Sequence, residues 1–194
     1  MNIDVLTGNV LDHKDIQYFY RGIIIVSESN NLQKMAVYCR NITSPIGFLK
    51  MISDDRKLKS IHFVDECSDN ETNDIEILNI AESQLIEYFA GHRLKFDLEL
   101  DPEGTLFQKR VWEAVAAVSY GETRNYGDIA KELGSLNFSR AVGMANGKNP
   151  LPIIIPCHRI IGNDGKLTGY SGGLEKKKWL LVHEQKYSGN SLFL

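Results

Sequence analysis

The spacing of apolar residues changes near residue 75 and divides the chain into two kinds of structure. Before it, short apolar runs that are rich in β-branched and aromatic side chains predict strands separated by turns. The predicted strands are residues 22–26, 34–39, 48–53 and 60–64, and the predicted turns are residues 44–47 and 54–55. The first part of the chain therefore favours a small β-sheet.

A helical period begins after the acidic loop at residues 68–74. Apolar side chains there recur every three or four positions, which predicts a helix over residues 75–90 that ends at Gly91. The next stretch, residues 94–100, alternates apolar and charged side chains and predicts an extended connector. The sequence DPEG at residues 101–104 is the expected domain boundary.

The second part of the chain predicts three helices. The sequence TLFQ at residues 105–108 has the capping-box pattern, so a first helix begins there. Asn125 is placed to cap a second helix over residues 126–133, and a third helix over residues 138–146 follows a turn at residues 134–137. Two short helices joined by a glycine-containing turn have the spacing of a helix-turn-helix, although most helical hairpins bind no DNA.

The composition, with 43% apolar and 24% charged residues, excludes a disordered, collagen-like or coiled-coil chain. A length of 194 residues allows one large domain or two small ones. No apolar run approaches the roughly 20 residues that a bilayer span needs, and the N-terminus lacks a secretory signal pattern. We therefore expect no membrane contact and a cytoplasmic location, or a nuclear one in a eukaryote. Three cysteines without a CxxC pair argue against a disulfide framework.

Charge is unevenly distributed between the two parts. Residues 1–103 carry 10 basic and 18 acidic residues, whereas residues 104–194 carry 12 basic and 7 acidic residues. Because positive charge attracts anionic partners, the second part is the one expected to meet an anion. This asymmetry strengthens the DNA-binding interpretation of the helix-turn-helix.

Residues 149–173 differ in composition from the rest of the chain. Three of the five prolines stand within residues 150–156, which predicts a stiff, extended and non-helical segment. The sequence Cys-His-Arg at residues 157–159 follows directly. Five glycines then crowd into residues 162–173, where the backbone can approach a ligand closely. A rigid arm that holds Cys-His-Arg beside a glycine-rich loop is typical of a site rather than of a core.

Cys157 is the candidate nucleophile, because a thiolate is strongly nucleophilic and the neighbouring His158 and Arg159 favour the thiolate form. Adjacent residues of an extended strand point to opposite faces, so His158 can act on Cys157 only at a turn or through a water molecule. The alternative is that Cys157 is a buried small hydrophobic residue, the commoner fate of a cysteine. Cys39 lies in an apolar strand pattern and Cys67 in an acidic loop, and both are expected to be structural.

The sequence IPCHRI at residues 155–160 resembles the active-site signature of the O6-alkylguanine-DNA alkyltransferase family. Further blocks resemble that family in order and spacing, with strong coverage over residues 84–185. They are FQKRVW at 107–112, YGETRNYG at 120–127, RAVG at 140–143, NP at 149–150, GYSGGL at 169–174 and WLLVHE at 179–184. Six ordered blocks are far more specific than the Cys-His-Arg triplet alone.

The resemblance implies an α+β fold in two domains. A small α/β N-terminal domain with a β-sheet, residues 1–92, is expected to have a mainly structural role. A connector, residues 93–104, joins it to a mainly helical C-terminal domain with a helix-turn-helix, residues 105–194, that binds DNA and accepts the alkyl group.

The resemblance also implies a role for each matching residue at the reaction centre. Cys157 resembles the alkyl acceptor, and His158 the base that takes the thiol proton through a water molecule. Glu184 resembles the carboxylate that orients and polarises His158. Asn149 resembles the residue that braces the active-site turn, and Tyr126 the residue that helps to rotate the target nucleotide.

A further set of matching residues is implied to contact DNA or the flipped guanine. This set comprises Tyr126, Arg140, Arg159, Ile160, Tyr170, Ser171 and Gly172. Arg140, on the expected recognition helix, would fill the space that the flipped base leaves. The hydroxyl of either Tyr126 or Tyr170 would donate to the leaving guanine.

The implied function is DNA repair by direct, stoichiometric and irreversible alkyl transfer to the thiol of Cys157 after nucleotide flipping. The substrate would be double-stranded DNA that contains O6-alkylguanine, with O4-alkylthymine left open, and the protein is expected to be a monomer. No cofactor is expected, because the alkyl group stays on sulfur as a thioether. No zinc is expected either, because the histidines have no ligand spacing with Cys39 or Cys67; they are His13, His62 and His92.

Two other functions stay open on the residues alone. A Cys-His hydrolase or acyltransferase would use the same thiolate but would regenerate it, and a non-catalytic helix-turn-helix regulator would not need Cys157. Two surface expectations accompany these alternatives. His183 is expected to face solvent or to cap a helix end, and Lys176 to Lys178 are expected to form a solvated helix face.

Overall fold

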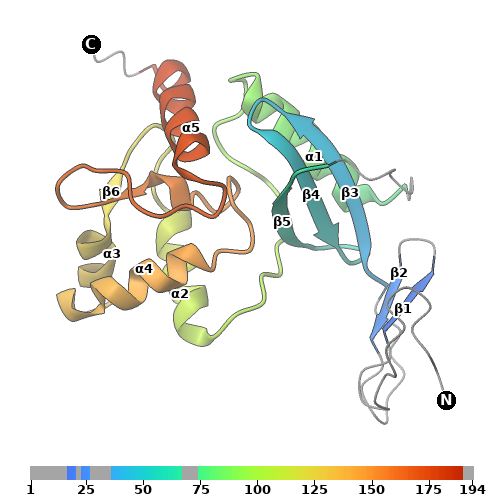
Figure 1. Ribbon diagram of the computed structural model, residues 1–194, viewed down its shortest axis with the longest axis horizontal. Coiled ribbons are helices and arrows are strands. Elements are labelled where there is room, and N and C mark those ends of the chain that lie inside the picture. Colours follow the sequence, from blue (N-terminus) through green and yellow to red (C-terminus); the bar gives the residue numbers. More distant parts are fainter. Residues whose placement is uncertain (1–16, 21–22, 27–35, 67–73, 190–194) are drawn as a thin grey trace.

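The computed structural model describes residues 17–20, 23–26, 36–66 and 74–189 of the chain. Figure 1 shows a β-sheet with one helix on one side of the molecule and a group of helices on the other. The fold is α+β, as the sequence predicts. Within the described ranges, no helix is long and apolar enough to cross a membrane.

The sheet is an antiparallel meander of three strands. In order they are β3 (Tyr38–Ser44), β4 (Gly47–Ser53) and β5 (Leu58–Val64). The last two predicted strands are confirmed as β4 and β5, each slightly longer than expected. Asp54 closes the turn between them, because its carboxylate accepts bonds from the backbone N–H groups of Arg56 and Lys57 at 2.9 and 2.7 Å.

The strand predicted at residues 34–39 is wrong in its limits. The observed strand β3 begins at Tyr38, and residues 34–35 lie outside the described ranges. The polar side chain of Arg40 interrupts the apolar pattern, but its Nη1 donates to Asn79 Oδ1 at 2.6 Å and to Glu82 Oε2 at 2.9 Å. A strand can therefore include a polar residue when a neighbouring helix supplies its partners.

A separate two-stranded hairpin precedes the sheet. It pairs β1 (Gln17–Tyr20) with β2 (Ile23–Val26) in antiparallel register. The apolar pattern predicts β2 but not β1. Gly22, the first residue of the predicted strand, lies outside the described ranges.

Helix α1 (Glu76–Phe89) packs against the sheet and confirms the helix predicted at this place (Figure 1). Its residues Leu78 and Leu85 are fully buried and belong to the same core as Leu49 and Met51 of β4. Each such side chain stabilises the fold by roughly 1.5–3 kcal/mol when it leaves water. Apolar burial therefore holds the first part together.

The connector that follows α1 runs in extended form along this part, as predicted. The side chain of Gln84 in α1 donates to the carbonyl of Asp97 at 2.7 Å and accepts from its N–H at 2.8 Å. Further along, Leu58 at the start of β5 bonds to the backbone of Glu99 and Asp101, each at 2.9 Å. The connector is thus attached to both the helix and the sheet before the second part begins.

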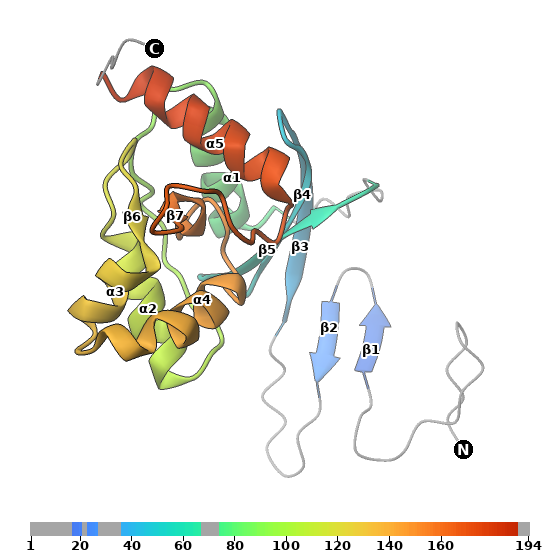
Figure 2. The same cartoon turned by 60° about the vertical axis from the view of Figure 1, so that its left-hand side comes forward.

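The second part consists of four α-helices. They are α2 (Leu106–Ala116), α3 (Tyr126–Glu132), α4 (Ser139–Gly147) and α5 (Leu174–Tyr187), and Figure 2 shows α2, α3 and α4 grouped together below α5. Both predicted capping residues are confirmed: Thr105 begins α2 and Asn125 begins α3 with a complete capping box. The first three of these helices lie where the sequence predicts them.

The connection between α3 and α4 has more structure than the predicted tight turn. A short 3₁₀ helix, η1 (Leu136–Phe138), lies in it, and the hydroxyl of Ser135 accepts a backbone N–H bond at its start. The indole N–H of Trp112 in α2 donates to the carbonyl of Ala145 in α4 at 2.9 Å. Helices α3 and α4 therefore form a helix-turn-helix that is attached to α2.

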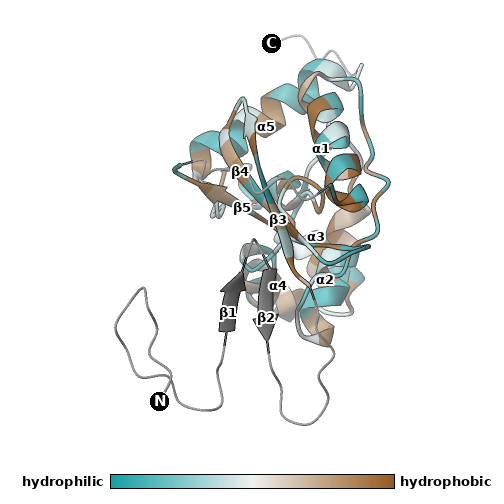
Figure 3. Ribbon diagram, turned by 90° about the vertical axis from the view of Figure 1, so that its right-hand side faces the viewer, coloured by the Kyte–Doolittle hydropathy of each residue, from teal (hydrophilic) through white to brown (hydrophobic). Residues whose placement is uncertain are grey.

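Figure 3 shows both hydrophobic and hydrophilic stretches on helices such as α1 and α5, as expected for elements with one face in a core. In the second part, Val111, Val115, Ile129 and Leu180 are fully buried. Two short parallel strands, β6 (Arg124–Asn125) and β7 (Ile160–Ile161), also pair in this part. The sequence does not predict this pair, and it brings the start of α3 next to the segment that follows Cys157.

Candidate active site

The proline-rich segment before Cys157 is a turn, and the expectation of an extended arm is wrong. The N–H of Ile155 donates to the carbonyl of Leu151 at 2.8 Å, and Ile153 has a φ of 77°, in the left-handed region. The Asn149 side chain braces this turn: its Nδ2 donates to the Ile155 carbonyl at 2.7 Å and its Oδ1 accepts from the Leu151 N–H at 3.0 Å. A proline fixes only its own φ, so the residues between prolines can still turn. The side-chain amide of Asn149 makes this possible, because it bonds backbone groups that have no partner in the turn itself.

Cys157 begins a short 3₁₀ helix, η2 (Cys157–Arg159), directly after this turn. The residue is only 4% exposed, and its N–H donates to the carbonyl of Ile155 at 2.8 Å. Burial raises the pKa of the Cys157 thiol, whereas a hydrogen bond from Asn149 and the charge of Lys177 act in the opposite direction. The thiol is therefore protonated at neutral pH and needs a base before it can attack.

His158 is fully buried and supplies such a base. Its Nε2 lies 2.8 Å from Oε1 of Glu184, and because a carboxylate only accepts hydrogen bonds, we assign the proton to Nε2. The other nitrogen, Nδ1, is then a proton acceptor, and it is buried without a hydrogen-bond partner in the described part of the chain. Burial lowers the pKa of His158, although Glu184 opposes this effect. The imidazole is thus neutral and can accept a proton at Nδ1.

Glu184 is the centre of the polar network around His158. Its carboxylate accepts bonds from the side chain of Arg159 at 2.9 and 3.0 Å, from the Tyr88 hydroxyl at 2.8 Å and from the Gly121 N–H at 3.1 Å. Burial opposes ionisation, yet the bonds and charges of His158 and Arg159 hold the pKa of Glu184 well below its usual value. The carboxylate is therefore charged and fixed in orientation.

Arg159 is a buried member of this network. We expected it to contact DNA or substrate, but it is only 6% exposed, and its guanidinium donates to Glu184 and to the carbonyl of Val118. A buried, bidentate guanidinium has little surface left for a phosphate, and a contact of Arg159 with DNA or the flipped guanine stays a prediction. Arg159 instead neutralises Glu184, which limits how strongly the carboxylate can stabilise a charged His158.

Lys177 is also buried, contrary to the expected solvated face of three lysines. Its ammonium group donates to the carbonyl of Ile160 at 2.6 Å and to the carbonyl of Thr168 at 2.7 Å. Burial lowers the pKa of Lys177 to about 8, and the neighbouring Cys157 opposes this effect. Lys177 thus links the backbone just before the glycine-rich loop, at Ile160, to the backbone within it, at Thr168. Ile160, expected at the base edge, is fully buried with its carbonyl bound to this lysine.

The loop before α5 carries three of the residues expected to contact the flipped guanine. Tyr170 and Gly172 are half-buried, Ser171 is exposed, and the N–H of Gly173 closes a turn on the Tyr170 carbonyl at 3.0 Å. The ring of Tyr170 meets the ring of His158 edge-on, with centroids 6.5 Å apart. Burial raises the pKa of Tyr170 well above its usual value, so its hydroxyl stays a hydrogen-bond donor.

Tyr126 and Arg140 lie on the helix-turn-helix, and Tyr126 contacts the glycine-rich loop. The pairing of β6 with β7 places Tyr126 at the start of α3, and the hydroxyl of Thr168 donates to the Tyr126 hydroxyl at 3.2 Å. A Cβ atom at Gly143 of α4 would lie 3.7 Å from the ring of Tyr126, so this tyrosine packs on the second helix of the motif. Arg140 is exposed and is the second residue of α4.

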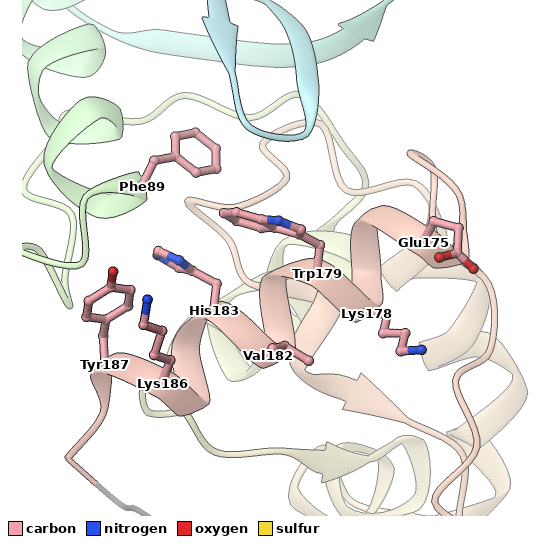
Figure 4. A pocket seen from close by; sticks show the side chains of 8 residues that line it. All are labelled: Phe89, Glu175, Lys178, Trp179, Val182, His183, Lys186 and Tyr187. Atoms are coloured by element: carbon pink, nitrogen blue, oxygen red, sulfur yellow. The ribbon is translucent and has the colours of Figure 1, made fainter.

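A contact between α1 and α5 reaches the network from the first part of the chain. We expected His183 to face solvent or to cap a helix end; it is buried, and its Nε2 lies 2.8 Å from the carbonyl of Tyr88 in the last turn of α1, so it caps that helix end. Figure 4 shows Trp179 and His183 of α5 beside Phe89 of α1; the rings of Trp179 and His183 stack with centroids 4.8 Å apart. A cavity of about 490 Å³ opens on this contact, and Cys157 does not line it.

Neither the hydroxyl of Tyr88 nor the buried amine of Lys177 was expected in the site. Tyr88 occupies an ordinary core position of an amphipathic helix, and only its bond to Glu184 reveals another role.

Among the described residues, no group of three His, Cys, Asp or Glu side chains is arranged to hold a metal ion. His13 and Cys67 lie outside those residues.

Two family models match the chain. The DNA-binding domain of 6-O-methylguanine DNA methyltransferase matches residues 106–186, and the ribonuclease-like domain of the same family matches residues 37–102. The chain belongs to the 6-O-methylguanine DNA methyltransferase family. This result confirms the resemblance that the sequence motifs indicate.

Individual members of this family are similar over most of their length. A methylated-DNA–protein-cysteine methyltransferase of Mycolicibacterium paratuberculosis is 46% identical over 159 residues, which is 80% of this chain and 96% of the relative. A protein of the same name from Methanosarcina acetivorans is 47% identical over 153 residues, or 76% of this chain and 98% of the relative.

Solved structures of family members share the fold. The crystal structure of the Mycobacterium tuberculosis O6-methylguanine methyltransferase has a TM-score of 0.71 and 42% sequence identity, and the match covers 80% of this chain and 97% of that one. A structure of the Mycobacterium tuberculosis protein in complex with DNA has a TM-score of 0.70 and 44% identity, with 77% and 93% of the two chains covered.

Proposed function

We propose that this protein is a methylated-DNA–protein-cysteine methyltransferase, which repairs DNA by moving an alkyl group from guanine O6 to the sulfur of Cys157. Membership of the family and the names of its relatives support the activity. The observation that carries it is the buried arrangement of Cys157, His158 and Glu184, in which Nδ1 of His158 is an acceptor. Because burial keeps the thiol protonated and the imidazole neutral, we expect the thiolate to form during the reaction with substrate rather than before it.

The first step is proton transfer from the thiol. The Sγ–H proton of Cys157 passes to Nδ1 of His158 through a water molecule, and His158 becomes an imidazolium. Glu184 stabilises that charge through Nε2, at 2.8 Å. Because Arg159 already shares the carboxylate, the imidazolium is stabilised only weakly and returns its proton readily.

The second step is displacement at the alkyl carbon. A bond forms between Sγ of Cys157 and the alkyl carbon, the bond between that carbon and guanine O6 breaks, and its electron pair stays on the guanine. The hydroxyl of Tyr170, which burial keeps protonated, would donate to the leaving base, and Tyr126 is the alternative donor. The imidazolium supplies the balancing proton, so guanine leaves neutral. The product is a thioether, and the transfer would be irreversible.

DNA binding would use the helix-turn-helix. The match to a family DNA-binding domain and the structure of a relative with DNA support DNA as the partner. Guanine O6 cannot be reached inside a base stack, so the nucleotide must be flipped out at a cost of a few kcal/mol. Arg140, exposed near the N-terminus of α4, would occupy the vacated stack, and Tyr126 would turn the nucleotide. The protein would act as a monomer on double-stranded DNA.

The mass of the intact protein tests this function. The protein is incubated with an excess of duplex DNA that contains one O6-methylguanine, and we expect one methyl group on the peptide that contains Cys157. At most one lesion is repaired per protein molecule. Cys157→Ala is the control, and it should bind the same duplex without gaining mass. Several lesions repaired per molecule with unmodified Cys157 would instead identify a recycling Cys-His enzyme.

A further inference from the structure

The sheet of the first part touches the active-site region at two neighbouring places on β5. The N–H of Ile61 donates to the carbonyl of Pro150, in the turn before Cys157, at 2.8 Å. Two residues later, Phe63 lies against the loop that precedes α5. Figure 2 shows β5 beside the start of α5. The outer edge of β5 therefore bonds to the turn before Cys157, and the side chain of Phe63 reaches the loop before α5.

The ring of Phe63 makes three contacts with residues of the loop and the start of α5. It meets the ring of Tyr170 edge-on, with centroids 5.9 Å apart. A Cβ atom at Gly172 would lie only 2.7 Å from it, so the glycine backbone rests directly on the ring. The ammonium group of Lys176 lies 5.6 Å from the centroid of the Phe63 ring. The loop before α5 therefore packs against Phe63, a residue of the first domain.

Packing, rather than hydrogen bonding, determines where the Tyr170 side chain lies. Its hydroxyl is buried without a hydrogen-bond partner among the described residues. Its ring stands between Phe63, at 5.9 Å, and His158, at 6.5 Å, in two edge-on contacts. Such aromatic contacts contribute about 0.5–1.5 kcal/mol each beyond the area that they bury. Removal of Phe63 would leave Tyr170 with one of these two neighbours.

We propose that Phe63 is a positioning residue for the substrate: it fixes the loop at residues 169–173 and so places Tyr170 for the flipped guanine. The first domain then determines how tightly the site takes an alkylated base, in addition to its role in the fold. This inference rests on the proposed function. The contacts described for Phe63 are with Tyr170, Gly172 and Lys176, so we expect the reactivity of the Cys157 thiol to be independent of it.

The test separates substrate capture from thiol reactivity in Phe63→Ala. Capture is measured with the free base O6-benzylguanine, from the concentration that gives half the maximal rate of benzyl transfer. Thiol reactivity is measured with iodoacetamide, which needs no base-binding loop, by the rate of alkylation of Cys157. We expect the half-saturating concentration to rise about tenfold, because one aromatic contact and the loop support are lost. The iodoacetamide rate should stay within about twofold, because that reaction does not use Tyr170.

Three further variants complete the experiment. Phe48→Ala removes a half-buried phenylalanine from the neighbouring strand β4, and the pairing of Phe48 with Val64 places it on the face opposite to Phe63. This variant should change neither the half-saturating concentration nor the iodoacetamide rate. Phe63→Tyr keeps the ring and should retain substrate capture. If Phe63→Ala does not fold, Phe63→Leu keeps most of the volume without the aromatic edge, and it should raise the half-saturating concentration by a smaller factor.

Distinct results would overturn the proposal. If Phe63→Ala and Phe63→Leu leave the half-saturating concentration unchanged, or if Phe48→Ala raises it equally, Phe63 does not position the loop. If the benzyl and iodoacetamide rates fall together, Phe63 supports the thiol and not the substrate. Failure of the unaltered protein to transfer a benzyl group, with normal iodoacetamide reactivity, would instead contradict the proposed function on which this inference rests.

Discussion

The three-stranded sheet and the region around Cys157 are both well buried, but they bury different kinds of side chain. In the sheet the fully buried positions are mostly apolar, such as Leu49 and Leu58. Around Cys157, the side chains of His158, Lys177 and Glu184 are fully buried although all three can ionise. The stability of the sheet region therefore depends on apolar area removed from water, and that of the Cys157 region depends on the hydrogen bonds among buried ionisable side chains.

The two regions also contain ion pairs of very different character. Arg40 and Glu82 pair at 2.9 Å where both side chains still reach solvent, and such pairs contribute little to stability. Arg159 and Glu184 pair at 2.9 Å in a site that solvent does not reach. Loss of one partner there leaves an uncompensated buried charge, which costs several kcal/mol. The active-site region should accordingly be the more sensitive of the two to single changes.

The largest expected effect on stability is that of Glu184→Ala. This change leaves the charge of Arg159 buried without its partner, and we expect the free energy of unfolding to fall by about 3–5 kcal/mol. The matched control is Glu82→Ala, which removes the surface partner of Arg40 and should cost less than about 1 kcal/mol. Both are measured by denaturant unfolding. Equal losses in the two variants would contradict the comparison of the two regions.

His158→Ala should slow alkyl transfer by about 10³-fold at neutral pH, because a general base contributes 10²–10⁴-fold. The loss should apply to duplex DNA and to free O6-benzylguanine alike, since His158 acts on the thiol. The rate of the variant should rise with pH, because burial raises the pKa of Cys157 and hydroxide must then remove its proton. His62→Ala, an exposed histidine of the sheet, is the control and should react normally.

Arg140→Ala should affect only substrates that must leave a base stack. If Arg140 offsets about 2 kcal/mol of the unstacking cost, repair of duplex DNA slows roughly 30-fold. The rate with free O6-benzylguanine should be nearly unchanged. The ratio of the two rates in one variant is the measurement, with Arg56→Ala in the first domain as the control. An equal loss with both substrates would show that Arg140 supports the fold or the thiol.

The smallest expected effect is a pH dependence of stability. Burial lowers the pKa of His158, so just below pH 6.5 the unfolded chain binds a proton that the folded chain does not. The free energy of unfolding should therefore fall as the pH drops below about 6.5, by at most about 1.4 kcal/mol per pH unit from this residue. His158→Ala should remove this component of the slope, whereas His62→Ala should retain it.

Much of the fold was accessible from the sequence. The helical period predicts α1, and the capping boxes at Thr105 and Asn125 predict where α2 and α3 begin. These signals are local, because each cap and each apolar face lies within one or two turns of chain. The strand β3 was misplaced, because Arg40 breaks the apolar pattern and its partners lie on a distant helix. The domain limits at residues 92 and 104 stay predictions.

Most of the helices, the helix-turn-helix spacing, the family and the adjacency of Cys157 and His158 can be inferred from the sequence. Which side chains surround these two residues depends on how the chain folds. Tyr88 and Glu184 stand 96 positions apart, and Lys177 is buried because two carbonyls from different ends of a loop converge on it. Periodicity along a chain records which face of an element is apolar. It does not record which distant polar atom will meet a side chain after folding, and burial and hydrogen bonding depend on that meeting.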